Sequence, residues 1–179
     1  SLMLELANWG IQNLNELTWI TSPPEGAVKQ ARELLHNLEA LENNRITLRG
    51  KDMLKLPTHP RIAHMLLSVT TPSEVCLAAD IASILEERDP LPKESGADLS
   101  LRVEVLRKSR RGDLVSGERN VLERIERLAS SWRRIFKLQV DNSNPVDAEV
   151  GKLVAEAYPE RIARQQDKQS VRYKLANGR

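Results

Sequence analysis

The chain has 179 residues, of which 40% are hydrophobic, 29% charged and 3% aromatic, and its formal net charge is +2. This composition excludes a disordered chain, and no apolar run approaches the roughly 20 residues of a membrane-spanning helix. A single cysteine, Cys76, excludes an internal disulfide and a cysteine-based zinc site and favours a reducing, cytoplasmic location.

Charge is divided unevenly along the chain. Residues 1–100 contain 9 Lys and Arg against 14 Asp and Glu, whereas residues 101–179 contain 18 against 11. A basic half beside an acidic half indicates that one end meets a polyanion while the other packs against protein. The same numbers also fit ordinary solvated helix faces, so charge alone leaves both interpretations open.

Helical periodicity dominates the first half, where apolar residues recur at intervals of three and four. Gly10 and the pair Pro23-Pro24 separate the first two helices. Residues 46–48 allow two interpretations: they form a brief strand, or Thr47 caps a helix that runs to Leu56. The other predicted elements are helices over 2–9, 25–41 and 60–69 and a turn over 42–45.

Proline and capping residues mark the helices of the second half. Thr71 to Glu74 form a capping box with Pro72 at the first helical position, and Asp98 is the expected N-cap of the next helix. Residues 172–175 alternate as a strand does but have no predicted partner, which indicates a segment cut from a longer protein. The other predicted elements are helices over 71–87, 98–108, 118–138 and 146–158, a helical turn within 159–166, a loop over 89–97 and a basic connector over 109–117.

A search for catalytic or cofactor-binding residues finds no complete set. Neither Gly50-Lys51 nor Gly151-Lys152 is followed by Ser or Thr, so neither is a phosphate-binding P-loop. The histidines, His36, His59 and His64, do not form the paired spacing of zinc proteases. We therefore predict no catalytic residue, no metal ligand and no cofactor site in this chain.

The helix expected over 118–138 has two contrasting faces. Its apolar arc contains Val121, Leu122, Ile125, Leu128, Ala129, Trp132, Ile135 and Phe136. The opposite side carries Arg119, Glu123, Arg127, Ser130, Arg134 and Lys137. Four of these six are cations, one to two turns apart, a spacing that suits successive phosphates.

Four cations nearby, Arg107, Lys108, Arg110 and Arg111, are placed to extend this cationic stripe, although connectors are often basic without a specific role. The predicted nucleic-acid-binding residues are thus Arg110, Arg111, Arg119, Arg127, Arg134 and Lys137. The alternative is a solvated face in which Arg119 and Arg127 pair with Glu123. Aromatic residues are too sparse for a base-stacking surface, so we expect contacts to the backbone that tolerate any sequence and weaken with salt.

Two stretches carry a family resemblance. The first consists of Pro23-Pro24, then Ala31, Leu34, Leu35, Leu38, Ala40 and Leu41, then Thr47, Leu48, Gly50, Leu54 and Leu56-Pro57, and finally Pro60 to Ala63 with Met65 to Leu67. It resembles the segment that follows the second motor domain in DEAH-box helicases. The second consists of Tyr158 to Ala163, then Arg172, Tyr173, Leu175 and Asn177 to Arg179, and is similar to the bacterial HrpB-type branch. One residue departs from the pattern, because Glu39 stands where the family usually has glycine.

The resemblance implies a mainly α fold with little strand: a small winged-helix domain over 1–69, a ratchet-like helical bundle over 70–157 and the start of a C-terminal region over 158–179. The parent would be an ATP-dependent RNA helicase, whose motor domains outside this segment bind ATP and Mg. The segment itself would be non-catalytic, with the motor domains and single-stranded RNA or DNA as its partners. Two alternatives remain at this point: a free-standing winged-helix regulator that binds duplex DNA through the 25–41 helix, and a helical protein-interaction module.

Overall fold

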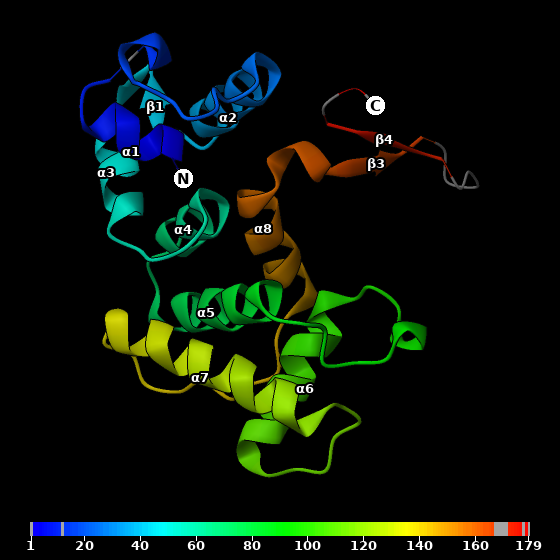
Figure 1. Ribbon diagram of the computed structural model, residues 1–179. Coiled ribbons are helices and arrows are strands. Elements are labelled where there is room, and N and C mark those ends of the chain that lie inside the picture. The colour runs from blue at the N-terminus through cyan, green and yellow to red at the C-terminus, as the bar shows by residue number, and fades with distance from the viewer. Residues whose placement is uncertain (1, 12, 167–171, 177, 179) are drawn as a thin grey trace. The chain divides into compact units, whose positions relative to one another are not determined.

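The computed structural model describes residues 2–11, 13–166, 172–176 and 178, and these are mainly helical, as predicted. The chain divides between Leu67 and Ser68 into two compact units (Figure 1). Asn177 and Arg179, which contribute to the resemblance, lie outside the described residues. The winged-helix and ratchet-like identities expected for 1–69 and 70–157, and the separate region expected over 158–179, stay predictions.

The first unit is a small helical core with one short hairpin. Its elements are α1 (Leu2–Asn8), η1 (Leu14–Glu16), α2 (Glu25–Asn37), β1 (Leu41–Glu42), β2 (Arg45–Ile46), α3 (Leu48–Leu54) and α4 (Pro60–Leu67). The fully buried side chains of this core are Leu4, Leu6, Leu35, Leu38, Met53, Met65 and Leu66. Only Leu35 is buried within α2, so most of that helix remains exposed or half-buried.

Helix α2 ends at Asn37, four residues before the predicted end. The cause is Glu39, whose φ of 55° lies in the left-handed region. Its N–H donates to the carbonyl of His36 (2.9 Å) and the N–H of Ala40 donates to that of Leu35 (2.8 Å), the pair of bonds that closes a Schellman motif. Glu39, which stands where the family usually has glycine, is therefore the residue of this turn whose left-handed conformation favours glycine most.

Both interpretations of residues 46–48 are realised, each in part. Strand β2 pairs antiparallel with β1 through a tight turn whose residues, Asn43 and Asn44, have φ values of 49° and 60°, as type I′ hairpin turns require. Thr47 then caps α3: its hydroxyl accepts from the N–H of Gly50 (2.9 Å) and donates to the carbonyl of Glu39 (2.6 Å). One threonine thus joins the end of α2 to the start of α3.

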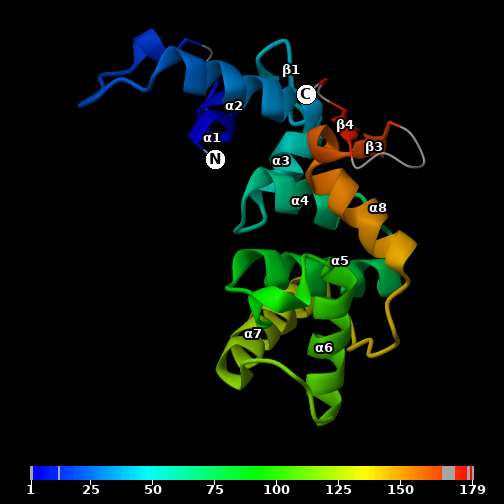
Figure 2. The same cartoon turned by 90° about the vertical axis from the view of Figure 1, so that its right-hand side faces the viewer.

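The second unit is a bundle built around α5 (Pro72–Glu86), which packs against α6 (Leu99–Arg111), α7 (Arg119–Ile135) and α8 (Asp147–Ala157) (Figures 1 and 2). Contact on several sides explains why ten successive residues, Val75 to Ile84, are buried. The predicted capping box of α5 is confirmed, since Thr71 and Glu74 each accept a hydrogen bond from the other's backbone N–H. Leu85, next to the last residue of α5, is 37% exposed.

Two helix ends differ from the prediction. Asp98 caps α6 as expected, but the helix continues to Arg111 and stops only at Gly112, which has a φ of 85°. Arg110 and Arg111 are therefore helical residues and not part of a connector. Helix α7 ends at Ile135, and Lys137, with a φ of 56°, forms a second Schellman motif with a charged residue at the left-handed position.

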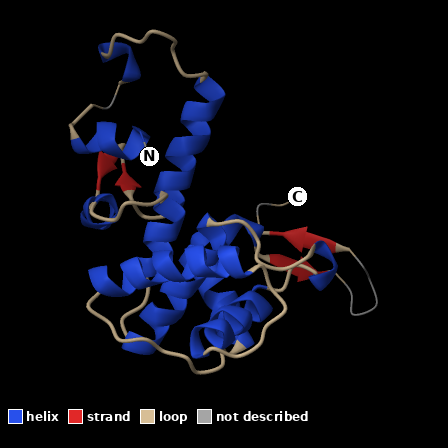
Figure 3. Ribbon diagram, turned by 60° about the horizontal axis from the view of Figure 1, so that its bottom comes forward, coloured by secondary structure: helices blue, strands red, loops and turns tan. Residues whose placement is uncertain are grey.

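The C-terminal part contains a second antiparallel hairpin, shown in red at the right of Figure 3. The helical turn predicted within 159–166 is present only as η3 (Pro159–Arg161), and β3 (Ala163–Gln165) follows it. Strand β4 (Tyr173–Leu175) pairs with β3, so the prediction of a strand without a partner was wrong. Among the described helices, none is both long and apolar enough to cross a membrane.

Candidate nucleic-acid interface

Helix α7 separates its apolar and cationic sides as its periodicity predicts. Most of the predicted arc is buried, namely Val121, Leu122, Ile125, Ala129 and Trp132. The arc faces α5 and α6, the two helices that α7 contacts most closely in the bundle. Ile135, at the last turn, is 47% exposed and marks the end of this packing. The opposite side of the helix remains at the surface.

The exposed side carries the cationic stripe, which we define as Arg119, Arg127, Arg134 and Lys137. Arg127, Arg134 and Lys137 are exposed and have no carboxylate partner within the described part of the chain. Arg119 instead pairs with Glu123 at 3.0 Å while its side chain stays 90% exposed. The alternative of a neutralised face therefore holds for Arg119 and not for Arg127.

The geometry of the stripe follows from the helix. Arg127 and Arg134 are seven residues apart, which places them about 10.5 Å apart along the axis on nearly the same side. Arg127 also lines a hollow of about 350 Å³ between α6 and α7, together with Ser109, Glu123 and Glu126. Lys137 lies beyond the last helical residue, so its side-chain direction is set by the Schellman turn and not by the helical period.

Arg107 and Arg110 do not extend the stripe, and that prediction is corrected. Arg107 is buried and pairs with Asp80 at 2.9 Å. Arg110 is held in a similar way. Its side chain is 8% exposed, and its guanidinium pairs with Asp80 (2.7 Å) and with Glu126 (2.6 Å). Arg111 is intermediate: it pairs with Asp113 at 3.1 Å and donates to the carbonyl of Asn142 at 2.7 Å, with 34% of its side chain exposed. All three arginines are held by the protein, and Arg110 has too little surface to meet a phosphate.

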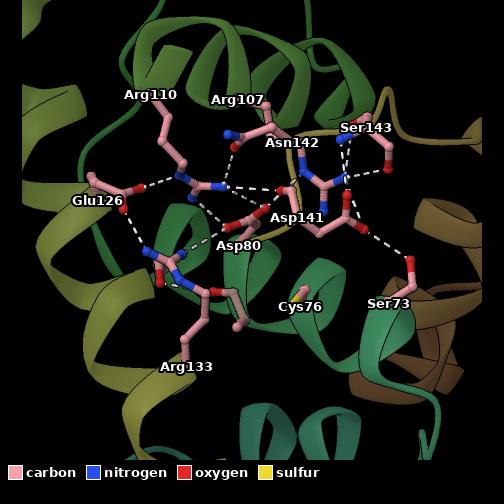
Figure 4. A network of polar contacts seen from close by, with 12 residues as sticks. Ser73, Cys76, Asp80, Arg107, Arg110, Glu126, Arg133, Asp141, Asn142 and Ser143 are labelled. Carbon is pink, nitrogen blue, oxygen red and sulfur yellow. Dashed lines mark hydrogen bonds and ion pairs between the residues drawn. The ribbon is translucent and has the colours of Figure 1, made fainter. Parts of the chain in front are cut away.

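Arg110 belongs to a buried ion network that joins α5, α6 and α7 (Figure 4). Asp80, 1% exposed on α5, receives Arg107 at 2.9 Å and Arg110 at 2.7 Å, and Arg133 lies 3.6 Å away. Glu126 on α7 bridges Arg110 and Arg133, with a distance of 2.5 Å to the latter. Three guanidinium groups from two helices thus surround one carboxylate of the central helix.

The loop after α7 closes the network. Arg107 donates to the carbonyl of Ser143 (2.8 Å) and lies 3.8 Å from the carboxylate of Asp141. Asp141 in turn accepts from the hydroxyl of Ser73, in the first turn of α5, at 2.9 Å. Counting Asp141, the network holds three cations and three anions, so the buried group is neutral as a whole (Figure 4).

The network shifts the pKa values of three groups. Burial alone would raise the pKa of Asp141, but hydrogen bonds from Ser143 and Ser73 and the charge of Arg107 hold it below its ordinary value. Burial alone would lower the pKa of Arg110, but the carboxylates of Asp80 and Glu126 outweigh it and raise the pKa above its ordinary value. Burial, together with Asp80 and Asp141, raises the pKa of the Cys76 thiol, which donates to the carbonyl of Gln139 at 3.1 Å. Cys76 is therefore an unreactive core residue.

The sequence contained one signal of this network that was not used. Asp80 is the one charged residue in the buried run from Val75 to Ile84, and a carboxylate within a buried helix needs cationic partners. Its partners come from residues 27 to 53 positions away in the sequence, so spacing alone does not reveal them. Within the described residues, no group of three or more His, Cys, Asp or Glu is arranged to hold a metal ion.

Comparison with known proteins finds similarity to RNA helicases. No family model matches the chain. The chain is 33% identical over 177 residues to the ATP-dependent RNA helicase HrpB of Escherichia coli (strain K12). The aligned region covers 99% of this chain and 19% of that protein. It is 28% identical over 121 residues to the probable ATP-dependent RNA helicase DHR2 of Saccharomyces cerevisiae, covering 64% of this chain and 16% of that protein.

Solved structures agree with the sequence comparison. The crystal structure of the E. coli DExH-box NTPase HrpB matches with a TM-score of 0.73 and 29% identity, over 99% of this chain and 19% of that one. A crystal structure of the E. coli DEAH/RHA helicase HrpB matches with a TM-score of 0.74 and 29% identity, over 99% and 20%. By sequence and by fold the chain therefore corresponds to a segment of the HrpB-type DEAH-box helicases, and it spans about one fifth of the length of these relatives.

Proposed function

We propose that this chain is a non-catalytic accessory segment of an ATP-dependent RNA helicase, which braces the motor domains and guides single-stranded nucleic acid. Its relatives with this fold are named as ATP-dependent RNA helicases, which supports the class of activity. The proposal places ATP and Mg in motor domains outside this chain, because neither Gly50-Lys51 nor Gly151-Lys152 continues into a P-loop. The segment then acts in the cytoplasm on the polynucleotide and not on the nucleotide.

The single observation that carries the guiding role is the surface of α7. Arg127 and Arg134 are exposed and have no carboxylate partner within the described residues, whereas Arg107, Arg110 and Arg133 of the same bundle are buried in ion pairs. Guanidinium groups about 10.5 Å apart along a helix suit two phosphates of one strand. Such contacts bind the backbone without reading bases.

The bracing role is supported by the apolar surface of the first unit. Trp9, Ile20 and Leu48 are 69%, 106% and 80% exposed, and α2 is mostly uncovered. Exposed large apolar side chains are suited to a protein partner, which in this proposal is the motor domains. The winged-helix identity of this unit belongs to the same proposal.

Binding of short fluorescent oligonucleotides tests the guiding role. We expect single-stranded RNA to bind with a Kd on the order of 10⁻⁴ to 10⁻⁶ M at moderate salt, as nonspecific backbone contacts do. The double variant R127A/R134A should bind several-fold more weakly, and the slope of log K against log salt should fall by about 0.7 for each phosphate that is no longer bound.

The matched control is K51A/K93A, which also removes two exposed cations and should bind as the unaltered chain does. Equal binding by R127A/R134A and the control would remove the stripe from the mechanism. Preference for duplex DNA over single strands would instead favour a winged-helix regulator. An absence of binding to either nucleic acid would favour a protein-interaction module.

A further inference from the structure

The hairpin of β3 and β4 carries an unusual pair of charges. The register places Arg164 directly opposite Lys174, between the pairs Ala163–Leu175 and Gln165–Tyr173. Residues directly opposite in an antiparallel pair have Cβ atoms about 4.5–5.5 Å apart, and like charges at that distance destabilise the pairing. Both cations are exposed, and neither strand contains a carboxylate.

The same face of the hairpin is basic beyond this pair. Side chains alternate between the two faces of a strand, so Arg172 shares the face of Lys174, and Ile162 shares that of Arg164. The N–H of Gln166 donates to the carbonyl of Arg172 (3.1 Å) and that of Ala176 to the carbonyl of Ile162 (2.8 Å), so the ladder extends one residue past each strand end. The folded hairpin therefore holds Arg164 and Lys174 directly opposite each other on one face, at a cost in free energy that a bound anion would offset.

A hollow accompanies the cations. It has a volume of about 370 Å³ and its wall combines Arg164 and Lys174 with Ile162, Leu175 and Ala176. Ile162 is 51% exposed, so the apolar end of the hollow is open to a ligand. A ligand that fills the hollow would place an anionic group beside Arg164 and Lys174 and a flat or apolar group beside Ile162. A nucleotide unit of a single strand has both.

We propose that the β3–β4 hairpin is a second nucleic-acid contact of this chain, in which Arg164 and Lys174 together bind one backbone phosphate while the hollow beside Ile162 receives the adjoining sugar or base. The ligand class rests on the proposed function, and the site is separate from the stripe on α7. Bound phosphate between the two cations replaces their repulsion by two charge-assisted contacts. Binding should therefore also stabilise the pairing of β3 with β4.

The K174E variant separates this site from a merely structural hairpin, because the two effects have opposite signs. Opposite charges directly across an antiparallel pair are favourable, so the hairpin should become more stable and the N–H groups of Gln166 and Ala176 should exchange more slowly with solvent. Affinity for fluorescent single-stranded RNA should nevertheless fall several-fold, and the salt slope should fall by about 0.7 because one phosphate is no longer bound. R164E should behave in the same way.

The control is K93E, the same charge change at an exposed lysine that has no carboxylate partner among the described residues. The proposal is overturned when K174E and R164E bind RNA as tightly as K93E does. Loss of binding in K174E and R164E but not in R127A/R134A would leave the hairpin as the contact and refute the stripe. The reverse result would refute the hairpin alone, and unchanged binding in all three variants would refute both proposals.

Discussion

Replacing Asp80 with Asn tests whether the buried ion network holds the second unit together. Asp80 is 1% exposed and pairs with Arg107 and Arg110 at 2.9 and 2.7 Å. Without its charge, the network would hold three guanidinium groups against the two carboxylates of Glu126 and Asp141. Breaking a buried ion pair by removing one partner costs about 3–5 kcal/mol, because the remaining charge is buried without compensation. Since domains are stable by about 5–15 kcal/mol, the variant should lose about a fifth or more of its stability.

Trp132 provides the signal for this experiment, because it lies on α7 and is only 4% exposed. With Trp9 and Trp19 replaced by Phe, fluorescence during urea unfolding follows the second unit alone. Asp98→Asn is the matched control, because Asp98 is an exposed N-cap and Asn caps a helix as well as Asp does. A loss below about 1 kcal/mol in D80N would mean that the network contributes no more than surface ion pairs do.

Three further predictions concern single residues. Glu39→Gly should stabilise the first unit by about 0.5–1 kcal/mol, because it removes the left-handed strain of a non-glycine residue at a φ of 55°, and destabilisation on urea unfolding would contradict this. Gly50→Ala should destabilise the first unit by about 1–3 kcal/mol, since a Cβ at that position would meet the backbone carbonyl of Ala40. Gly151→Ala on α8, where a Cβ meets no other atom, should be neutral or stabilising by up to about 1 kcal/mol. Equal effects of the two substitutions would refute the steric reason. The hydrogen bond from Arg102 holds the pKa of Asp89 below its usual value. The ionised Asp89 therefore contributes fully to stability above the unfolded pKa of about 3.9, and this contribution is lost as pH falls through the folded pKa. D89N should lose less stability than the unaltered chain between pH 5 and pH 2.5, and an equal loss would contradict this.

Helix starts were predictable because their signals are local. Thr47, Thr71 and Asp98 each accept a hydrogen bond from an N–H two or three residues later. The two groups of such a contact are close in the sequence, so the residue types alone indicate it. Helix ends were less predictable, because two Schellman motifs place Glu39 and Lys137 where glycine is the recognisable signal. The surrounding packing offsets the cost of the left-handed conformation at these two residues, and that packing cannot be read from the local sequence.

Long-range pairing explains the other misses. The strand Ala163–Gln165 has little intrinsic preference for β structure and forms through its register with Tyr173–Leu175. The ion network likewise depends on side chains from four separate segments, so Arg110 looked like a surface residue until Asp80 and Glu126 were placed beside it. The two faces of α7 were predicted correctly up to its last turn, because both follow from one helical period, whereas Ile135 is exposed and Lys137 lies beyond the helix.

Helix α7 shows how neighbouring residues of the same chemistry acquire different roles. Glu126 and Arg133 point into the ion network, while the next residues, Arg127 and Arg134, are exposed, since one step along a helix turns the side chain by about 100°. The contacts of Glu126 and Arg133 with the network therefore fix the rotation of α7 and with it the direction in which Arg127 and Arg134 point. The excess of Lys and Arg in the second half also overstates the charge available to a polyanion, because the network neutralises three arginines internally. In the proposed function, what remains for nucleic acid is a small set of exposed cations, so binding should be weak and sensitive to salt.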